Sequence, residues 1–382
     1  MSLLQNIFAF KRNREDIEPF SRPSVFAVLR YFVVVLSLIF GALSLYGLGS
    51  GGSFYLYVAQ DPFSPGVKPW YAESVLHVGL THLLGFDKTH LQMQLFVLSF
   101  GISSVMFVGI IVWRRFSELW AYILMALLFF HPLLMILFTW SLHPDAVTVF
   151  CTAIIFFTNS YVAIFIFALF GAMNHASQMV IICTSAIVCR VLLENNYRFA
   201  LTVGLGWLAG KGLLETYLGY HGIIIEKNRL QGLLDFDTDT FFDLFMQSPW
   251  WTLFTLHSVY WILLFGMLVY GFWLSKRAVI ALVISQSLAL VFGLITYDTT
   301  RVHAVLGWAG FTYCLLYLLQ RLDTKPRVPR YLFYAIIAVS IIGSIAAPKK
   351  YKFYDIKGVE KHQNHFAEIL RKYQIWEKIG LE

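Results

Sequence analysis

The sequence has 382 residues, of which 58% are hydrophobic and only 13% are charged. A soluble domain carries roughly 25% charged residues, and a disordered chain is poor in apolar residues, whereas the mean hydropathy here is +0.66. These values exclude soluble, disordered, coiled-coil and collagen-like classes. They predict an all-α protein, a polytopic transmembrane helical bundle.

The net charge of +7 has a simple explanation in such a protein. Lys and Arg mark cytoplasmic loops and contact anionic lipid, so we expect membrane lipids, and not nucleic acid, as partners. The four cysteines lie in apolar runs without C-x-x-C spacing, which predicts packing residues and no disulfide framework: Cys151, Cys183, Cys189 and Cys314. They also have no nearby histidine cluster, so no zinc site is implied.

Hydropathy divides the chain into three parts. A cytoplasmic segment (1–26) precedes a transmembrane domain (27–348), and a basic tail (349–382) follows. Because about 20 apolar residues cross a bilayer as a helix, we predict about eleven spans. The predicted spans are 27–48, 91–113, 118–140, 145–157, 161–173, 176–193, 199–220, 252–274, 278–297, 302–320 and 330–347.

The breaks between the middle spans are Thr158-Asn159-Ser160 and Asn174-His175. With the N-terminus inside, most loop Lys and Arg fall on the inner side, as the positive-inside rule requires. Two long outer loops result, 49–90 and 221–250. The first contains a predicted interfacial helix over 70–84. The second contains Asp235, Asp237 and Asp239, which we interpret as a solvated acidic run, because Thr240 replaces the glycine of a calcium-binding loop.

With this topology, the notable polar residues collect on the outer side. Ionisable groups at membrane depth are costly and indicate a functional site. The candidates are Asp61, His143, Asp145, His175, Lys211, Glu215, Asp298, Arg301 and His303.

Each candidate also has a structural interpretation. His143 and His175 could cap helices, and Asp145 could be an N-cap carboxylate. Lys211 and Glu215 have the i,i+4 spacing of a helical ion pair. Asp61 precedes a proline and could belong to a turn, and Asp298 and Arg301 could be solvated loop charges. Taken together, these residues are stronger evidence for a functional site than any one of them alone.

This arrangement resembles the GT-C superfamily, polytopic glycosyltransferases that use lipid-phosphate-linked sugars. The resemblance rests on Asp61 shortly after the first span, on the following Pro69-Trp70-Tyr71-Ala72-Glu73 with the helix Ser74–Leu84, and on Leu142-His143-Pro144-Asp145 before a short span. Many members have an arginine near the positions of Glu73 or His77, from which this sequence departs.

The resemblance implies an inverting transfer of a sugar from a polyprenyl phosphate to a hydroxyl acceptor, a glycan or a lipid, on the outer face. Asp61 would be the catalytic base. The donor phosphate would be bound by Arg301, with Lys211, His175 and His303 as further candidates. Residues that would orient the acceptor or the base are His143, Asp145, Asp298 and Glu215.

Other functions remain open for this sequence. A lipid-linked glycan polymerase or ligase would share the donor and the outward site, a transporter would show inverted repeats, and a structural subunit would need no polar cluster. A bacterial inner membrane is favoured over the endoplasmic reticulum, with a cell-envelope glycan as product.

Overall fold

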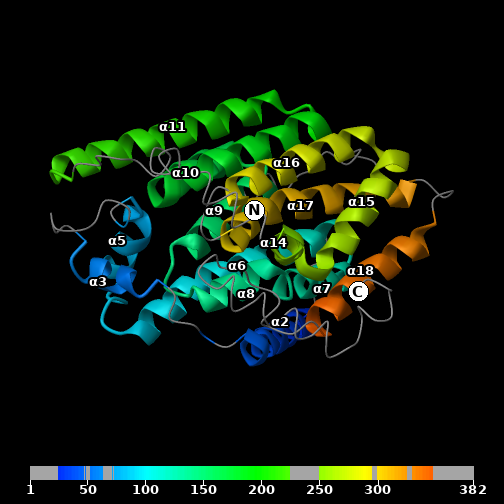
Figure 1. The fold of residues 1–382 in the computed structure, drawn as a ribbon, viewed down its shortest axis with the longest axis horizontal. Helices are drawn as coiled ribbons and strands as arrows, with labels where there is room; N and C mark the ends of the chain where they lie inside the picture. Colours follow the sequence, from blue (N-terminus) through cyan, green and yellow to red (C-terminus); the bar gives the residue numbers. More distant parts are fainter. Residues whose placement is uncertain are drawn as a thin grey trace, which may run out of the picture.

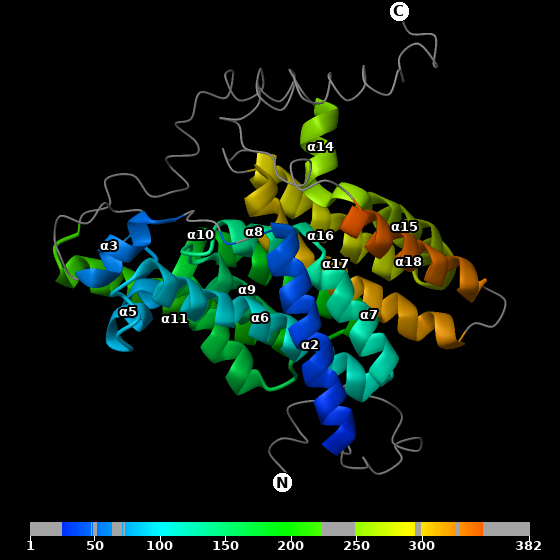
Figure 2. The same cartoon turned by 90° about the horizontal axis from the view of Figure 1, so that it is seen from below.

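The computed structural model describes residues 25–46, 48, 52–62, 71, 73–223, 249–294, 299–324 and 329–346. Throughout these ranges the protein is helical and contains no strand (Figures 1 and 2). The predicted all-α class is therefore confirmed. Several features predicted from sequence lie outside the described residues: the N-terminal segment up to residue 24, the acidic run of the second outer loop, Asp298 and the tail 349–382.

The described helices follow the apolar stretches closely. Their bounds are α2 (Val25–Tyr46), α3 (Phe54–Gln60), α5 (Val75–Leu83), α6 (His90–Arg115), α7 (Glu118–Phe129), α8 (Pro132–Thr139), α9 (Asp145–Phe157), α10 (Tyr161–Glu194), α11 (Tyr197–Tyr220), α14 (Pro249–His257), the 3-10 helix η1 (Ser258–Tyr260), α15 (Trp261–Leu274), α16 (Lys276–Leu294), α17 (Thr299–Thr324) and α18 (Arg330–Ala346).

In the described part of the chain, six helices are long and apolar enough to cross a membrane, or up to seven if the bent pair α7–α8 counts as one span. The chain is thus a multi-pass membrane protein by length and composition, and the expected count of about eleven is not confirmed. α9 and α18 are apolar but have only 13 and 17 residues.

The predicted span 118–140 is broken near its middle. α7 and α8 meet at an angle of 53°, where His131 has an extended backbone and its Nδ1 accepts a hydrogen bond from the Leu133 amide. Pro132 follows directly and is the first residue of α8. Because a proline disfavours helical backbone at the preceding residue, the helix ends before His131 and restarts in a new direction.

α10 reverses its direction at His175, whose φ of −160° and ψ of 77° are not helical. A straight helix of this length would separate its ends by about 50 Å. Instead, the Tyr161 hydroxyl donates to Asn196 Oδ1 over 3.2 Å, so the two ends meet. α10 is therefore a helical hairpin, and the break predicted at Asn174-His175 lies at its tip.

The basic residues gather at one end of the bundle, which we call the Arg190 end. Arg190 is buried and donates to Asn159 Oδ1, to Glu194 and to the carbonyls of Phe156 and Thr158. Arg277 donates to Asn195 at the same end. The opposite end, one α9 length or about 20 Å away, carries Asp145 and is called the Asp145 end.

α11 packs against the first arm of the α10 hairpin through glycines. A Cβ at Gly210 would lie only 2.3 Å from the Leu169 carbonyl oxygen, whereas a Cβ at Gly212, on the same helix, would have no atom within 4 Å. Gly210 therefore permits the close approach of the two backbones.

We expect Gly210→Ala to destabilise the protein by about 1–3 kcal/mol, because an added methyl group must push the two helices apart. The measurement is the thermal unfolding midpoint of the purified protein in detergent, which should fall by several degrees. Gly212→Ala is the matched control and should leave the midpoint unchanged or raise it, since alanine favours the helix. Equal midpoints for both variants would contradict this packing.

Candidate functional site

A buried ion pair lies at the Asp145 end of the bundle. Arg301 Nη1 donates to Asp145 Oδ2 over 2.9 Å, and the Asp145 side chain is fully buried. The same Nη1 lies 2.8 Å from His143 Nδ1. The His143 nitrogen also lies 3.3 Å from Asp145 Oδ2, so the imidazole contacts both members of the ion pair. Arg301 and Asp145 therefore contribute one positive and one negative charge, and His143 lies against both.

Three separate segments bring these groups together. His143 lies in the short connection between α8 and α9, Asp145 is the first residue of α9, and Arg301 lies in the first turn of α17. The tip of the α10 hairpin completes the cluster. There Asn174 Nδ2 donates to the Pro144 carbonyl and to Thr148 Oγ1, both over 2.9 Å, and Gln178 donates to Asp145 Oδ1 over 3.4 Å.

Aromatic rings enclose the ion pair. The Arg301 guanidinium lies over the Trp140 ring, 5.4 Å from its centroid, a cation–π contact. Tyr55 of α3 contacts the His143 ring edge to face at 4.9 Å and the His77 ring of α5 at 5.5 Å. α3 and α5, the helices of the first outer loop, are therefore part of this site.

α5 buries polar side chains next to Val78 and exposes leucines at its C-terminal end. Ser74, His77 and Thr81 are fully buried, whereas Leu83 and the following Leu84 are exposed. Buried polar residues together with exposed leucines suit a helix that contacts lipid at one end. Burial, and next the charge of His143, lowers the pKa of His77 to about 3, so its imidazole is neutral.

Two of the other residues predicted for the site form a separate pair. Lys211 and Glu215 bind each other over 3.1 Å on the outer half of α11, and the Glu215 side chain is 63% exposed. The structure thus places them in the i,i+4 helical pair that their spacing allowed. His175 lies at the hairpin tip, close enough to act electrostatically on Asp145, and its Nδ1 is 3.3 Å from the Ser177 hydroxyl.

Asp61 lies at the C-terminal end of α3 and is exposed. Among the described residues it forms no ion pair and no side-chain hydrogen bond. The next residue, Pro62, accepts a hydrogen bond from the Tyr217 hydroxyl of α11 over 3.4 Å. α3 therefore connects Asp61, at one of its ends, to Tyr55 and the ion-pair cluster at the other, a rise of roughly 9 Å.

His303 faces a second polar cluster, which sequence reasoning did not find. Its Nε2 lies 3.1 Å from His257 Nε2, and both rings are buried. Ser258, directly after His257, has a φ of +51°, a conformation that L-residues rarely adopt. The sequence carried no spacing signal for this pair, because α14 and α17 approach each other only through the tertiary fold.

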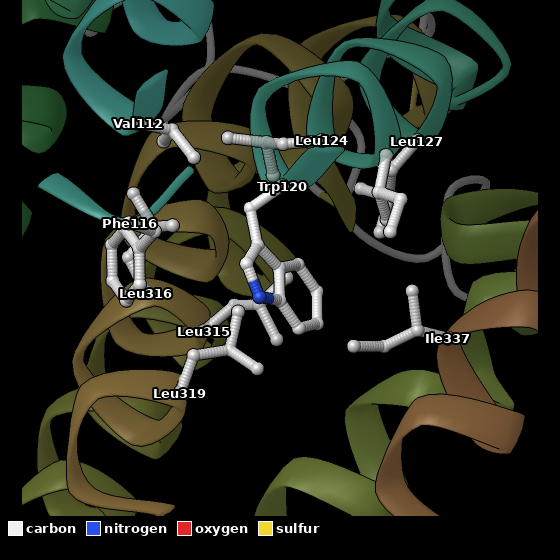
Figure 3. A pocket seen from close by; sticks show the side chains of 10 residues that line it. Val112, Phe116, Trp120, Leu124, Leu127, Leu315, Leu316, Leu319 and Ile337 are labelled. Atoms are coloured by element: carbon white, nitrogen blue, oxygen red, sulfur yellow. The ribbon is translucent and has the colours of Figure 1, made fainter. Parts of the chain in front are cut away.

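A pocket lined by apolar side chains lies apart from the ion-pair cluster. An apolar pocket lies between α6, α7, α17 and α18, with the Trp120 ring at its centre and leucines around it (Figure 3). Its apolar lining includes Phe116, Leu315 and Ile337.

In the described ranges, no group of three or more His, Cys, Asp or Glu side chains could hold a metal ion. The four cysteines are free and buried, as expected of packing residues.

The ion-pair cluster thus joins three of the predicted residues, His143, Asp145 and Arg301, with His175 next to them. Sequence reasoning missed Tyr55, His77, Trp140 and Gln178.

No protein-family model matches the chain, and no curated protein sequence matches it either.

We expect Arg301→Met to destabilise the protein by about 3–5 kcal/mol, because it leaves the buried Asp145 carboxylate without its cation. The double variant Arg301→Met with Asp145→Leu should recover most of this loss, since it removes both charges. Thermal unfolding in detergent measures both effects.

Arg321→Met is the control for this experiment, because Arg321 lies on the same helix, at its far end, and is exposed. It should change the unfolding midpoint little. The single variant Asp145→Leu completes the comparison: if its loss and that of Arg301→Met simply added in the double variant, Arg301 and Asp145 would not be coupled.

Proposed function

We propose that this protein is a membrane glycosyltransferase that moves a sugar from a polyprenyl phosphate to a hydroxyl acceptor. The main support is the convergence of Arg301, Asp145 and His143 in one buried cluster beside α3 and α5, the helices of the first outer loop. A planar guanidinium suits a phosphate group in geometry and charge. No metal and no cofactor are required for this chemistry.

The proposed roles divide between two carboxylates. Asp145 is paired with Arg301 and holds the guanidinium in place, together with His143. Asp61 is exposed and is not held in an ion pair among the described residues, so it is the carboxylate that can accept a proton. α3 places both carboxylates in one region, because it runs from Tyr55, beside the ion-pair cluster, to Asp61 over a rise of roughly 9 Å.

The transfer is a single displacement at the anomeric carbon of the sugar. The acceptor hydroxyl gives its proton to the Asp61 carboxylate while its oxygen forms a bond to that carbon. The bond from the carbon to the phosphate oxygen breaks, and the polyprenyl phosphate leaves with the electron pair. Arg301 stabilises the charge on the departing phosphate, with His175 next to it.

The charge asymmetry supports an outward site. Arg190 and Arg277 lie at the end opposite Asp145, and the positive-inside rule assigns that basic end to the cytoplasm. The Asp145 end then faces the periplasm or the lumen, where polyprenyl-phosphate sugars present their headgroups in this proposal. We favour a bacterial inner membrane and a cell-envelope glycan, and the acceptor is a glycan or a lipid.

The test is a transfer assay with the full chain in lipid nanodiscs. Undecaprenyl phosphate carrying a radiolabelled hexose is the donor, and a lipid and glycan extract supplies acceptors. We expect label to leave the donor with release of undecaprenyl phosphate. Asp61→Asn should slow this transfer by about 10²–10⁴-fold, because the base is lost, while the unfolding midpoint stays unchanged.

Asp87→Asn is the control, because Asp87 is a carboxylate of the same outer segment that is bound by His82 over 2.9 Å. It should retain transfer. Full activity in Asp61→Asn would overturn the assignment of the base. Release of polyprenyl diphosphate from a glycan-loaded lipid would instead favour a polymerase or ligase, and uptake without bond cleavage would favour a transporter.

A further inference from the structure

His77 is a buried side chain with no assigned role. It is fully buried on α5, and neither of its ring nitrogens has a hydrogen-bond partner among the described residues. A buried polar group without a partner is rare in a folded protein and requires an explanation. Its neighbour one turn earlier, Ser74, is also fully buried, and its hydroxyl is likewise without a partner there.

Two further buried polar atoms without a hydrogen-bond partner among the described residues belong to the tip of the α10 hairpin. Asn174 and Gln178 use their amide nitrogens to bind the Pro144–Asp145 segment, and their amide oxygens have no partner among the described residues. Asn174 and Gln178 therefore lie directly against the segment that carries Asp145. His77 lies near enough to His143 and Asp145 for electrostatic interaction, and Tyr55 contacts both His77 and His143.

The chemical character of these groups differs from that of Arg301. A neutral imidazole has one N–H donor and one acceptor nitrogen, a hydroxyl is both donor and acceptor, and the two amide oxygens are acceptors. Such a set matches neutral hydroxyl groups, which also donate and accept, and it offers no charge to a phosphate. α5 could have turned its leucines inward, but it buries Ser74 and His77 instead.

We propose that His77, with Ser74, Asn174 and Gln178, forms a neutral subsite that binds sugar hydroxyl groups next to the phosphate-binding Arg301. The inference rests on the proposed function and deepens it, because it names the part of the donor that α5 recognises. In this arrangement Arg301 binds the phosphate of the donor, His77 binds its sugar, and Asp61 faces the acceptor.

The experiment compares two lipid probes on the full chain in nanodiscs, by native mass spectrometry or competition binding. The probes are undecaprenyl phosphate and undecaprenyl phosphate carrying one hexose. For the unaltered protein we expect the hexose-bearing lipid to bind about tenfold more tightly, the effect of one or two buried hydrogen bonds. In His77→Phe this preference should disappear, while undecaprenyl phosphate itself binds as before.

Three variants sharpen the test. His77→Gln restores a donor and an acceptor and should recover part of the preference. Thr81→Val is the matched control, since Thr81 lies one turn further on the same buried face and its hydroxyl is already bound to the His77 carbonyl over 2.8 Å. Ser74→Ala should also weaken the preference for the hexose-bearing lipid. It provides an independent test of the subsite should His77→Phe fail to fold.

The outcomes separate the two proposals. If the unaltered protein binds neither lipid, the proposed function fails and the subsite fails with it. If it binds both lipids equally, or if His77→Phe keeps the tenfold preference at an unchanged unfolding midpoint, the subsite is overturned and the proposed function stands. Loss of the preference in Thr81→Val as well would also overturn the subsite, because the effect would then be structural.

Discussion

The ion pair between Arg301 and Asp145 is the interaction on which the Asp145 end of the molecule depends. Two opposite charges in a low-dielectric interior attract strongly, and each is costly without the other. The pair therefore fixes the first turn of α17 against the first turn of α9. His143, Trp140 and the α10 hairpin tip then take positions around a guanidinium that is already in place. In the proposed function, this pairing also holds the cation that binds the donor phosphate.

Sequence reasoning predicted the helices well because apolar stretches of this length have few alternatives in a membrane protein. It also predicted the break at Asn174-His175, where two polar residues interrupt an apolar run. It failed to predict the bend at His131, since a proline can begin a helix as well as end one. The span count was not confirmed, because length and hydropathy alone do not decide how short helices such as α9 lie in a bilayer.

For the site, the pattern of ionisable residues was informative, but it did not resolve which of them meet. His143, Asp145 and Arg301 converge, whereas Lys211 binds Glu215 and His303 binds His257. Spacing along one helix predicts an i,i+4 pair, but contacts between distant segments depend on the tertiary packing. His77 was noted only as a departure from an arginine of the resembled superfamily, because a lone histidine in an amphipathic segment gives no role until the buried face of the helix is known.

The two ends of the bundle also differ in which buried polar groups they contain. At the Arg190 end, one guanidinium binds two backbone carbonyls and two side chains and closes the connection between α9 and α10. At the Asp145 end, the neutral side chains of Ser74, His77, Asn174 and Gln178 have buried polar atoms without a hydrogen-bond partner among the described residues. The basic end can therefore serve as a rigid foundation, and conformational changes during a reaction cycle would be confined to the opposite half. Hydrogen exchange should accordingly be slow in the helix segments around Arg190 and faster in α3 and α5.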